Sequence, residues 1–130
     1  MIYVDTSVLL AQLLAEDKTP PASLWSEPLV SSRLAEYEIW TAIHRGGLTR
    51  SHGEAARQLL SHLSFLELSP LALARAVDPF PVPVRTLDAL HLASVEFLRS
   101  RRLHVLLATY DRRMVVVARR LRIPLFPLGH

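Results

Sequence analysis

The hydrophobic positions of this chain alternate between short continuous runs and stripes of helical spacing. Four apolar runs, at residues 2–4, 29–31, 65–68 and 104–108, have the length and composition of buried β-strands. Residues 123–126 predict a fifth strand. Pro124 places that strand at an edge of the sheet, because proline has no N–H to donate.

Helices are predicted between these runs from apolar periodicity and capping residues. They cover residues 8–16, 32–45 with Ser32 as the cap, 51–63 with a Ser51–Glu54 capping box, a helix starting at Pro70, 86–100 with Thr86 as the cap, and 110–121. Residues 78–83 contain three prolines and predict an extended loop. The alternation predicts an α/β fold whose mainly parallel sheet is covered on both faces. Without a repeat or a linker, residues 1–130 are expected to form a single domain.

Four acidic residues are candidates for a common site. Asp5 ends the first predicted strand and Asp111 follows the fourth, and the carboxyl ends of parallel strands are where sites form in open sheets. Asp88 lies in the first turn of its helix, where the helix dipole favours a carboxylate. Glu38 lies near the apolar side of its helix, and a buried acid needs a partner.

Each acid also has a simpler explanation when it is taken alone. Asp5 and Asp111 could cap helices, Asp88 could be a favourable first-turn charge, and Glu38 could belong to a polar helix face. Four carboxylates in one place would repel one another unless a cation neutralised them, and Mg²⁺ or Mn²⁺ prefers oxygen ligands. A water bound to such a metal can attack a phosphodiester. Spacing alone leaves both explanations open.

Charge and composition narrow the class of protein. The net charge is +3, and the segment from Arg99 to Arg122 carries eight arginines against the single acid Asp111. This basic quarter predicts either a nucleic-acid partner, with Arg112 and Arg113 as candidate phosphate contacts, or a solvated helix face. The absence of cysteine excludes disulfides and thiolate metal sites. No apolar stretch reaches the length of a membrane span and no leader is visible, so a cytoplasmic protein without a membrane partner is expected.

Four motifs carry a family resemblance over nearly the whole chain. "MIYVDTSVLL", "SSRLAEYEIWTAI", "RTLDALHLASVEFL" and "LATYDRRMVVVARRLRIPLFP" occur here in the order and spacing found in PIN-domain proteins of the VapC type. The chain therefore resembles the toxin ribonucleases of bacterial toxin–antitoxin pairs. It departs from many members at Thr41, where they have Arg, and at Arg122, where they have Gly.

The resemblance implies a three-layer α/β/α sandwich and an Mg²⁺- or Mn²⁺-dependent endoribonuclease. It implies that Asp5, Glu38, Asp88 and Asp111 are the catalytic and metal-binding acids, with Thr6, Ser7 and Thr109 as supporting polar residues. It further implies a VapB-like antitoxin, an RNA substrate and a homodimer, with larger toxin–antitoxin assemblies possible.

Several residues and functions keep alternatives. His91 lies three residues after Asp88 and could form a metal-binding pair with it, although a packed histidine is favoured. Trp40 is predicted in the core or a dimer interface, and Phe80 as an exposed contact for a base. The alternative function is a non-catalytic RNA- or partner-binding module. A phosphate-accepting receiver domain is disfavoured, because "FLELSP" offers no aspartate at the end of the third strand.

Overall fold

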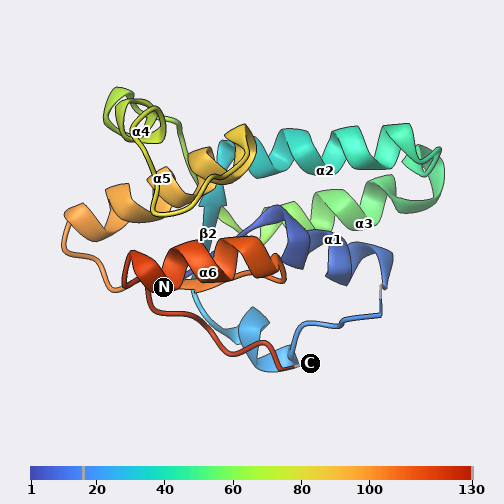
Figure 1. Cartoon of the computed structure of the whole chain (residues 1–130). Helices are drawn as coiled ribbons and strands as arrows, with labels where there is room; N and C mark the ends of the chain where they lie inside the picture. The colour runs from blue at the N-terminus through green and yellow to red at the C-terminus, as the bar shows by residue number, and fades with distance from the viewer. Residues whose placement is uncertain (16, 130) are drawn as a thin grey trace.

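A computed structural model describes residues 1–15 and 17–129 of the chain. Its elements, in order, are β1 (Ile2–Val4), α1 (Thr6–Leu14), the 3₁₀ helix η1 (Ala22–Ser26), β2 (Leu29–Ser32), α2 (Arg33–Arg45), α3 (Thr49–Ser61), β3 (Ser64–Leu66), α4 (Pro70–Ala76), α5 (Thr86–Ser100), β4 (Leu106–Ala108) and α6 (Arg112–Arg120) (Figure 1). The fold is the predicted three-layer α/β/α sandwich around a parallel sheet.

The four strands have the order β3-β2-β1-β4, and every pairing is parallel. The chain therefore moves outward from β1 to β2 and β3 on one side and adds β4 on the other side of β1. Such a reversal is a topological switch point, where the loops that leave two neighbouring strands diverge and open a crevice. Asp5 follows β1 and Asp111 follows β4, so both lie beside this crevice.

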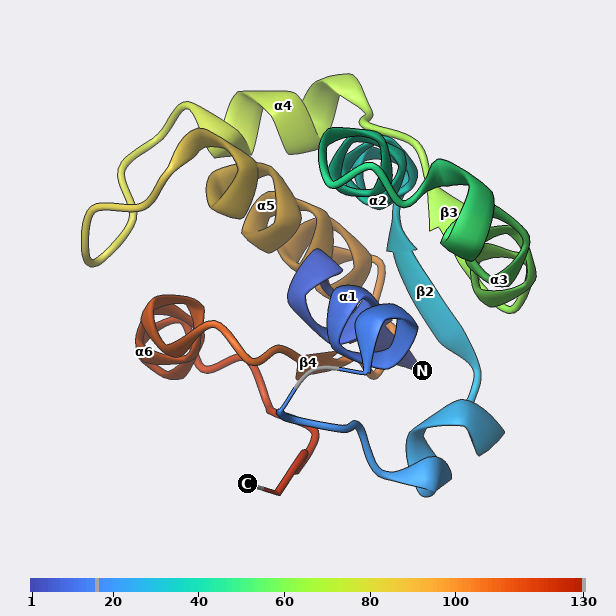
Figure 2. The same ribbon diagram turned by 90° about the vertical axis from the view of Figure 1, so that its right-hand side faces the viewer.

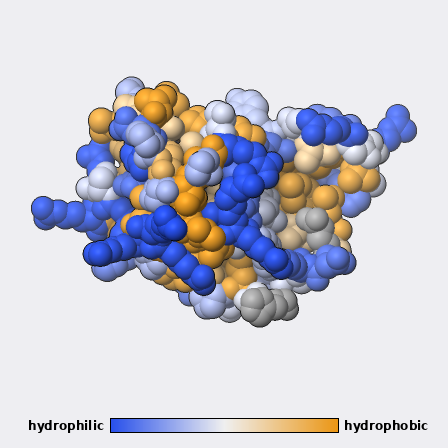
Figure 3. Space-filling view, viewed as in Figure 1, coloured by the Kyte–Doolittle hydropathy of each residue, from blue (hydrophilic) through white to orange (hydrophobic). Residues whose placement is uncertain are grey.

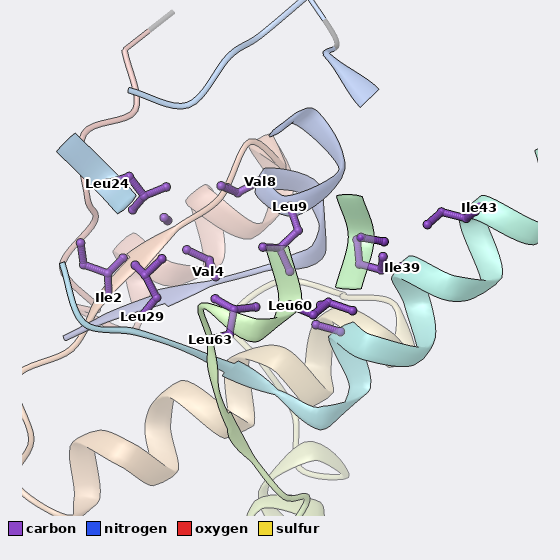
Figure 4. Close-up of a cluster of buried hydrophobic side chains, with 13 residues drawn as sticks. Ile2, Val4, Val8, Leu9, Leu24, Leu29, Ile39, Ile43, Leu60 and Leu63 are labelled. Atoms are coloured by element: carbon purple, nitrogen blue, oxygen red, sulfur yellow. The ribbon is translucent and has the colours of Figure 1, made fainter. Parts of the chain in front are cut away.

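Period-two alternation sorts the strand residues between two cores. Ile2 and Val4 pack with residues of α1, α2 and α3, including Leu9 and Ile39 (Figure 4). Tyr3, between them in β1, packs on the opposite face with residues of α5 and α6. Figure 2 shows α4 on the outside of α5, farther from the strands. The layers follow from this alternation, because each face of the short strands is apolar and must be covered.

Several predicted boundaries move by one to three residues. The first helix begins at Thr6 instead of residue 8, since Asp5 caps it; it ends at Leu14, and Glu16 lies outside the described residues. β3 ends at Leu66, two residues before its predicted end, and β4 begins only at Leu106.

Two predicted helix caps are wrong. The helix α3 begins at Thr49, and the Ser51 hydroxyl donates to the carbonyl of Leu48, so Ser51 forms no capping box. Thr86 is the first helical residue of α5, and Arg85 precedes it without a side-chain cap. The predicted cap Ser32 is confirmed, because its hydroxyl accepts the N–H of Leu34. The helix α4 begins at Pro70 as predicted, with the Ser69 hydroxyl accepting the N–H of Ala72.

The last predicted strand is reduced to one bridge. Leu125 pairs in parallel with Leu107 of β4, at the edge that Pro124 predicts. The Pro124 carbonyl accepts the N–H of Leu107, but proline cannot return a bond, and the ladder does not extend. Within the described residues, no helix has the length and apolarity to cross a membrane.

Candidate functional site

Asp5 is buried directly after β1, beside the end of β4. Its side chain caps α1 by accepting the N–H of Val8 at 3.3 Å, and the residue is only 3% exposed. Two hydroxyls hold the carboxylate: Ser7 donates to Oδ1 at 2.6 Å, and Thr109 donates to Oδ2. The cap explanation of Asp5 is therefore confirmed, and the cap is also fixed at the expected site edge.

The same two hydroxyls tie the ends of β1 and β4 together. Thr109 accepts the N–H of Asp111 at 3.0 Å, and Ser7 accepts the N–H of Tyr110 at 2.9 Å. Each hydroxyl therefore donates to Asp5 and accepts from the β4–α6 connection. Ser7 and Thr109, two of the polar residues predicted beside the acids, therefore hold the Asp5 carboxylate against the loop between β4 and α6.

Burial and hydrogen bonding oppose each other at Asp5. Burial raises the pKa of its carboxyl, while the hydrogen bonds from Ser7 and Thr109 lower it, and the net direction is upward. Burial thus disfavours the ionised form of Asp5, and a nearby positive charge would stabilise that form.

Asp111 and Asp88 lie at two helix N-termini. Asp111 caps α6, with Oδ1 accepting the N–H groups of Arg113 at 2.9 Å and Met114 at 3.1 Å. Asp88 lies in the first turn of α5. Burial raises the pKa of Asp88, the negative charges of Asp111 and, more weakly, Glu38 raise it further, and Arg85 opposes them. Asp88, Asp111 and Glu38 therefore share one electrostatic neighbourhood.

Glu38 is held by groups from two other helices. The Thr6 hydroxyl of α1 donates to Glu38 Oε1 at 2.7 Å, and His91 Nε2 of α5 lies 2.6 Å from the same oxygen. The Glu38 side chain is 20% exposed, whereas that of His91 is 3% exposed. Glu38 is therefore fixed from the core side and open on the other.

Tyr3 fixes the other side of the His91 ring. His91 Nδ1 lies 2.6 Å from the Tyr3 hydroxyl, which also accepts the N–H of Ser32 at 3.2 Å. Burial raises the pKa of Tyr3, so this phenol keeps its proton. The arrangement that satisfies both bonds has Tyr3 donating to Nδ1 and His91 Nε2–H donating to Glu38. A continuous buried chain of hydrogen bonds thus runs from β1 through α5 to the Glu38 carboxylate.

The four acids do not form a closed metal cage in this structure. Among residues 1–15 and 17–129, no group of three His, Cys, Asp or Glu side chains is close enough together to hold a metal ion. Three of the acids use local donors: hydroxyls at Asp5, backbone N–H groups at Asp111, and Thr6 with His91 at Glu38. The metal site predicted for the four acids stays a prediction.

The remaining candidate residues differ in their exposure. Arg112 and Arg113 are exposed in the first turn of α6, directly beside Asp111. Phe80 is not the exposed contact that was predicted, because it packs against the second core with the Arg75 guanidinium 4.0 Å from its ring centroid. Trp40 is confirmed as partly buried against the first core.

His91 is the residue whose role the sequence interpretation missed. It is buried, as favoured, but its Nε2 contacts Glu38 and not Asp88, its neighbour in sequence. One feature of the sequence pointed to this contact. Glu38 and His91 are both polar residues on apolar helix faces, and buried polar groups require partners.

Comparisons with known proteins agree with this architecture. The PIN domain family model matches residues 2–120. Ribonuclease VapC47 from Mycobacterium tuberculosis is 32% identical over 122 residues, covering 88% of both chains. Ribonuclease VapC46 from the same species is 34% identical, covering 87% of this chain and 86% of the relative.

Solved structures show the same fold at lower sequence identity. The sarcin-ricin loop cleaving toxin VapC20 of M. tuberculosis superposes with a TM-score of 0.67 at 21% identity, covering 89% of this chain and 94% of that one. A chain of a toxin-antitoxin complex from Klebsiella pneumoniae superposes with a TM-score of 0.62 at 18% identity, covering 85% and 87%. The chain therefore belongs to the PIN-domain family, as a VapC-type member.

Proposed function

We propose that this chain is a metal-dependent endoribonuclease, the toxin component of a type II toxin–antitoxin pair. It cleaves RNA phosphodiester bonds at a site formed by Asp5, Glu38, Asp88 and Asp111. The relatives named ribonuclease support the activity, and their similarity extends over most of both chains.

One observation supports the site most directly. Asp88 is partly buried and lies near enough to Asp111 and Glu38 for both charges to raise its pKa. A fold gains nothing in stability from such an arrangement, because like charges disfavour one another's ionisation. A divalent cation would remove the repulsion and make the ionised forms favourable.

The donors present fit Mg²⁺ or Mn²⁺. Every candidate ligand is a carboxylate or hydroxyl oxygen, which these cations prefer over nitrogen or sulfur. Mg²⁺ commonly binds through one or two carboxylates and keeps several waters, so it needs no closed cage of three protein ligands. Asp5, Asp88 and Asp111 would hold the metal, with Glu38 as a further ligand or as the group that positions the attacking water. When bound, the metal would supply an activated water and stabilise charge on the phosphate oxygens.

The chain's own residues prepare this chemistry. Ser7 and Thr109 hold the Asp5 carboxylate in one orientation before any ligand arrives. Thr6 and His91 occupy Glu38 Oε1, which leaves its other oxygen to accept a proton or to orient water. Arg112 and Arg113, beside Asp111, would neutralise the RNA backbone as it approaches the acids.

A VapB-like antitoxin and a homodimer complete the proposal. The fold match to a chain of a toxin-antitoxin complex is consistent with an antitoxin partner. Leu71, Leu73 and Val77, in and directly after α4, are large exposed apolar residues, of the kind that a second protein chain covers.

The test is cleavage of a structured RNA with Mg²⁺ or Mn²⁺, compared with EDTA and with Asp5→Ala/Asp88→Ala. The proposal expects cleavage only by the unaltered chain and only with metal. Cleavage that survives the double substitution would refute the site.

A non-catalytic RNA- or partner-binding module is the second candidate function. It is favoured by the lack, among the described residues, of a three-residue metal cluster. Calorimetric titration separates the two: binding at millimolar Mg²⁺ or Mn²⁺ supports the nuclease, and no binding supports the module.

A further inference from the structure

A groove of about 810 Å³ runs between α6 and the C-terminal segment 125–129, and the two chain neighbours of Asp111 line it. Three cations line it, Lys18, Arg112 and Arg119, together with apolar and aromatic residues that include Tyr110, Leu125 and Phe126. Figure 3 shows apolar surface bordered by long hydrophilic side chains over α6. The volume lies in the range of clefts that bind small organic ligands.

One end of the groove lies next to Asp5 and Asp111. Thr109 lines it and donates to Asp5, and Arg112 directly follows Asp111. From this end the groove follows α6 to Arg119 near the end of the helix. A polymer whose reacting phosphate sits at the acids could therefore continue into the groove without leaving the protein surface.

The charge of the groove is opposite to that of the four candidate acids. Among the described residues, no carboxylate lines the groove. Within the same residues, neither Arg112 nor Arg119 has an ion-pair partner, although Arg33, Arg57 and Arg75 elsewhere are each paired with glutamates. The groove arginines therefore keep their charge available for an external anion.

The aromatic residues suit a polymer that carries bases. Tyr110 and Phe126 offer ring surface inside the groove, and the Lys18 ammonium lies 5.5 Å from the centroid of the Tyr110 ring. A cationic rim with aromatic surface is the combination that binds single-stranded nucleic acid, through phosphate neutralisation and base stacking.

We propose that this groove binds the single-stranded RNA segment next to the scissile phosphate. Lys18, Arg112 and Arg119 contact its phosphates, and Phe126 with Tyr110 contacts its bases. The proposal rests on the proposed nuclease function, because RNA is taken as the polymer that reaches the acids.

The test measures RNA binding instead of cleavage. A fluorescein-labelled single-stranded RNA 12-mer is titrated with the Asp88→Asn protein in EDTA, by anisotropy, at several salt concentrations. On this background, Lys18→Ala/Arg119→Ala is expected to weaken binding at least about fivefold. The slope of log affinity against log salt should shrink by about 1.4, since each phosphate contact on a single strand contributes about 0.7.

The matched control is Arg50→Ala/Arg120→Ala, which removes the same charge from exposed positions outside the groove. It should retain the parent affinity within about twofold. Phe126→Leu keeps an apolar side chain but removes the ring, and should weaken binding at least about fivefold with an unchanged salt slope. Thermal unfolding of each variant confirms that it is folded.

Equal affinity and slope for the groove double variant and its parent would overturn the proposal. Groove variants that keep the parent RNA affinity but no longer bind a VapB-like antitoxin would assign the groove to a protein partner, and the RNA proposal would be wrong. If the unaltered chain cleaves RNA and the groove variants bind RNA as the parent does, the groove proposal is wrong and the nuclease proposal stands. If RNA binding depends on the groove but the unaltered chain does not cleave RNA, the nuclease proposal is wrong and the groove proposal stands.

Discussion

Replacing His91 by alanine tests whether the buried hydrogen-bond chain orients Glu38. The substitution removes the donor 2.6 Å from Glu38 Oε1 and the acceptor 2.6 Å from the Tyr3 hydroxyl. It also leaves a cavity, because His91 is only 2% exposed. The cavity and the unsatisfied Tyr3 hydroxyl together should lower the free energy of unfolding by about 3 kcal/mol. For a chain of this size that is a decrease of about 10 °C in the unfolding midpoint, which leaves the protein folded at 25 °C.

The effect on cleavage should differ from the effect on stability. A partner that orients a metal-site carboxylate typically contributes about 10- to 100-fold in metal affinity or activity. We expect His91→Ala to lower the cleavage rate by that factor. His91→Gln returns an N–H near the Nε2 position, so it should recover most of the rate. His91→Asn places its amide near Tyr3, so it should recover stability more than rate.

The assays are urea unfolding and single-turnover cleavage of RNA at several Mg²⁺ concentrations, at a temperature where all variants are folded. Tyr3→Phe is the control, because it breaks the bond to Nδ1 and keeps the bond to Glu38. The reasoning is refuted if His91→Gln cleaves no faster than His91→Ala, or if folded His91→Ala cleaves at the rate of the unaltered chain.

Three further predictions concern stability and assembly. Asp88→Asn should raise the unfolding midpoint of the metal-free protein at pH 7.5. The pKa of Asp88 is raised in the folded state, so the folded protein loses stability as the pH rises and Asp88 ionises. Asparagine cannot ionise and avoids this loss. The gain should vanish in scanning calorimetry below about pH 4, near the ordinary pKa, and a gain independent of pH would contradict the reasoning. Arg122 has φ +57° just after α6, so Arg122→Gly should stabilise the protein by up to about 1 kcal/mol in urea unfolding; destabilisation would argue against backbone strain there. If α4 carries the dimer, Leu71→Asp/Val77→Asp should halve the mass measured by light scattering, and an unchanged dimer would place the interface elsewhere.

The sheet and the position of Asp5 were predictable because the physics is local. An apolar run that stops at a carboxylate indicates a buried strand followed by the N-terminus of a helix. Asp5 both follows the buried strand β1 and caps α1. The cap explanation of Asp5 is confirmed at α1, and a capping carboxylate can still belong to the proposed site. The same holds for Asp111 at α6.

The starts of α3 and α5 were misplaced for a physical reason. Leu48 and Arg85 precede these helices without a side-chain cap, so the sequence carries no capping residue there. Ser51 and Thr86 looked like caps because their chemistry suits that position, but both lie inside the helices.

The contact of His91 with Glu38 could not be read from spacing. The two residues are 53 positions apart, on helices whose relative placement depends on the whole sheet. Their shared feature, a polar side chain on an apolar face, indicated that each needed a partner but not which one.

An anomalous difference map from crystals of this chain grown with Mn²⁺ tests the central claim most directly. The proposed nuclease site predicts a manganese peak in the crevice between β1 and β4, bound by carboxylate oxygens of Asp5, Asp88 or Asp111, with Glu38 bound directly or through water. A crevice without a peak at saturating Mn²⁺, or a peak bound only by residues outside this set, would contradict it.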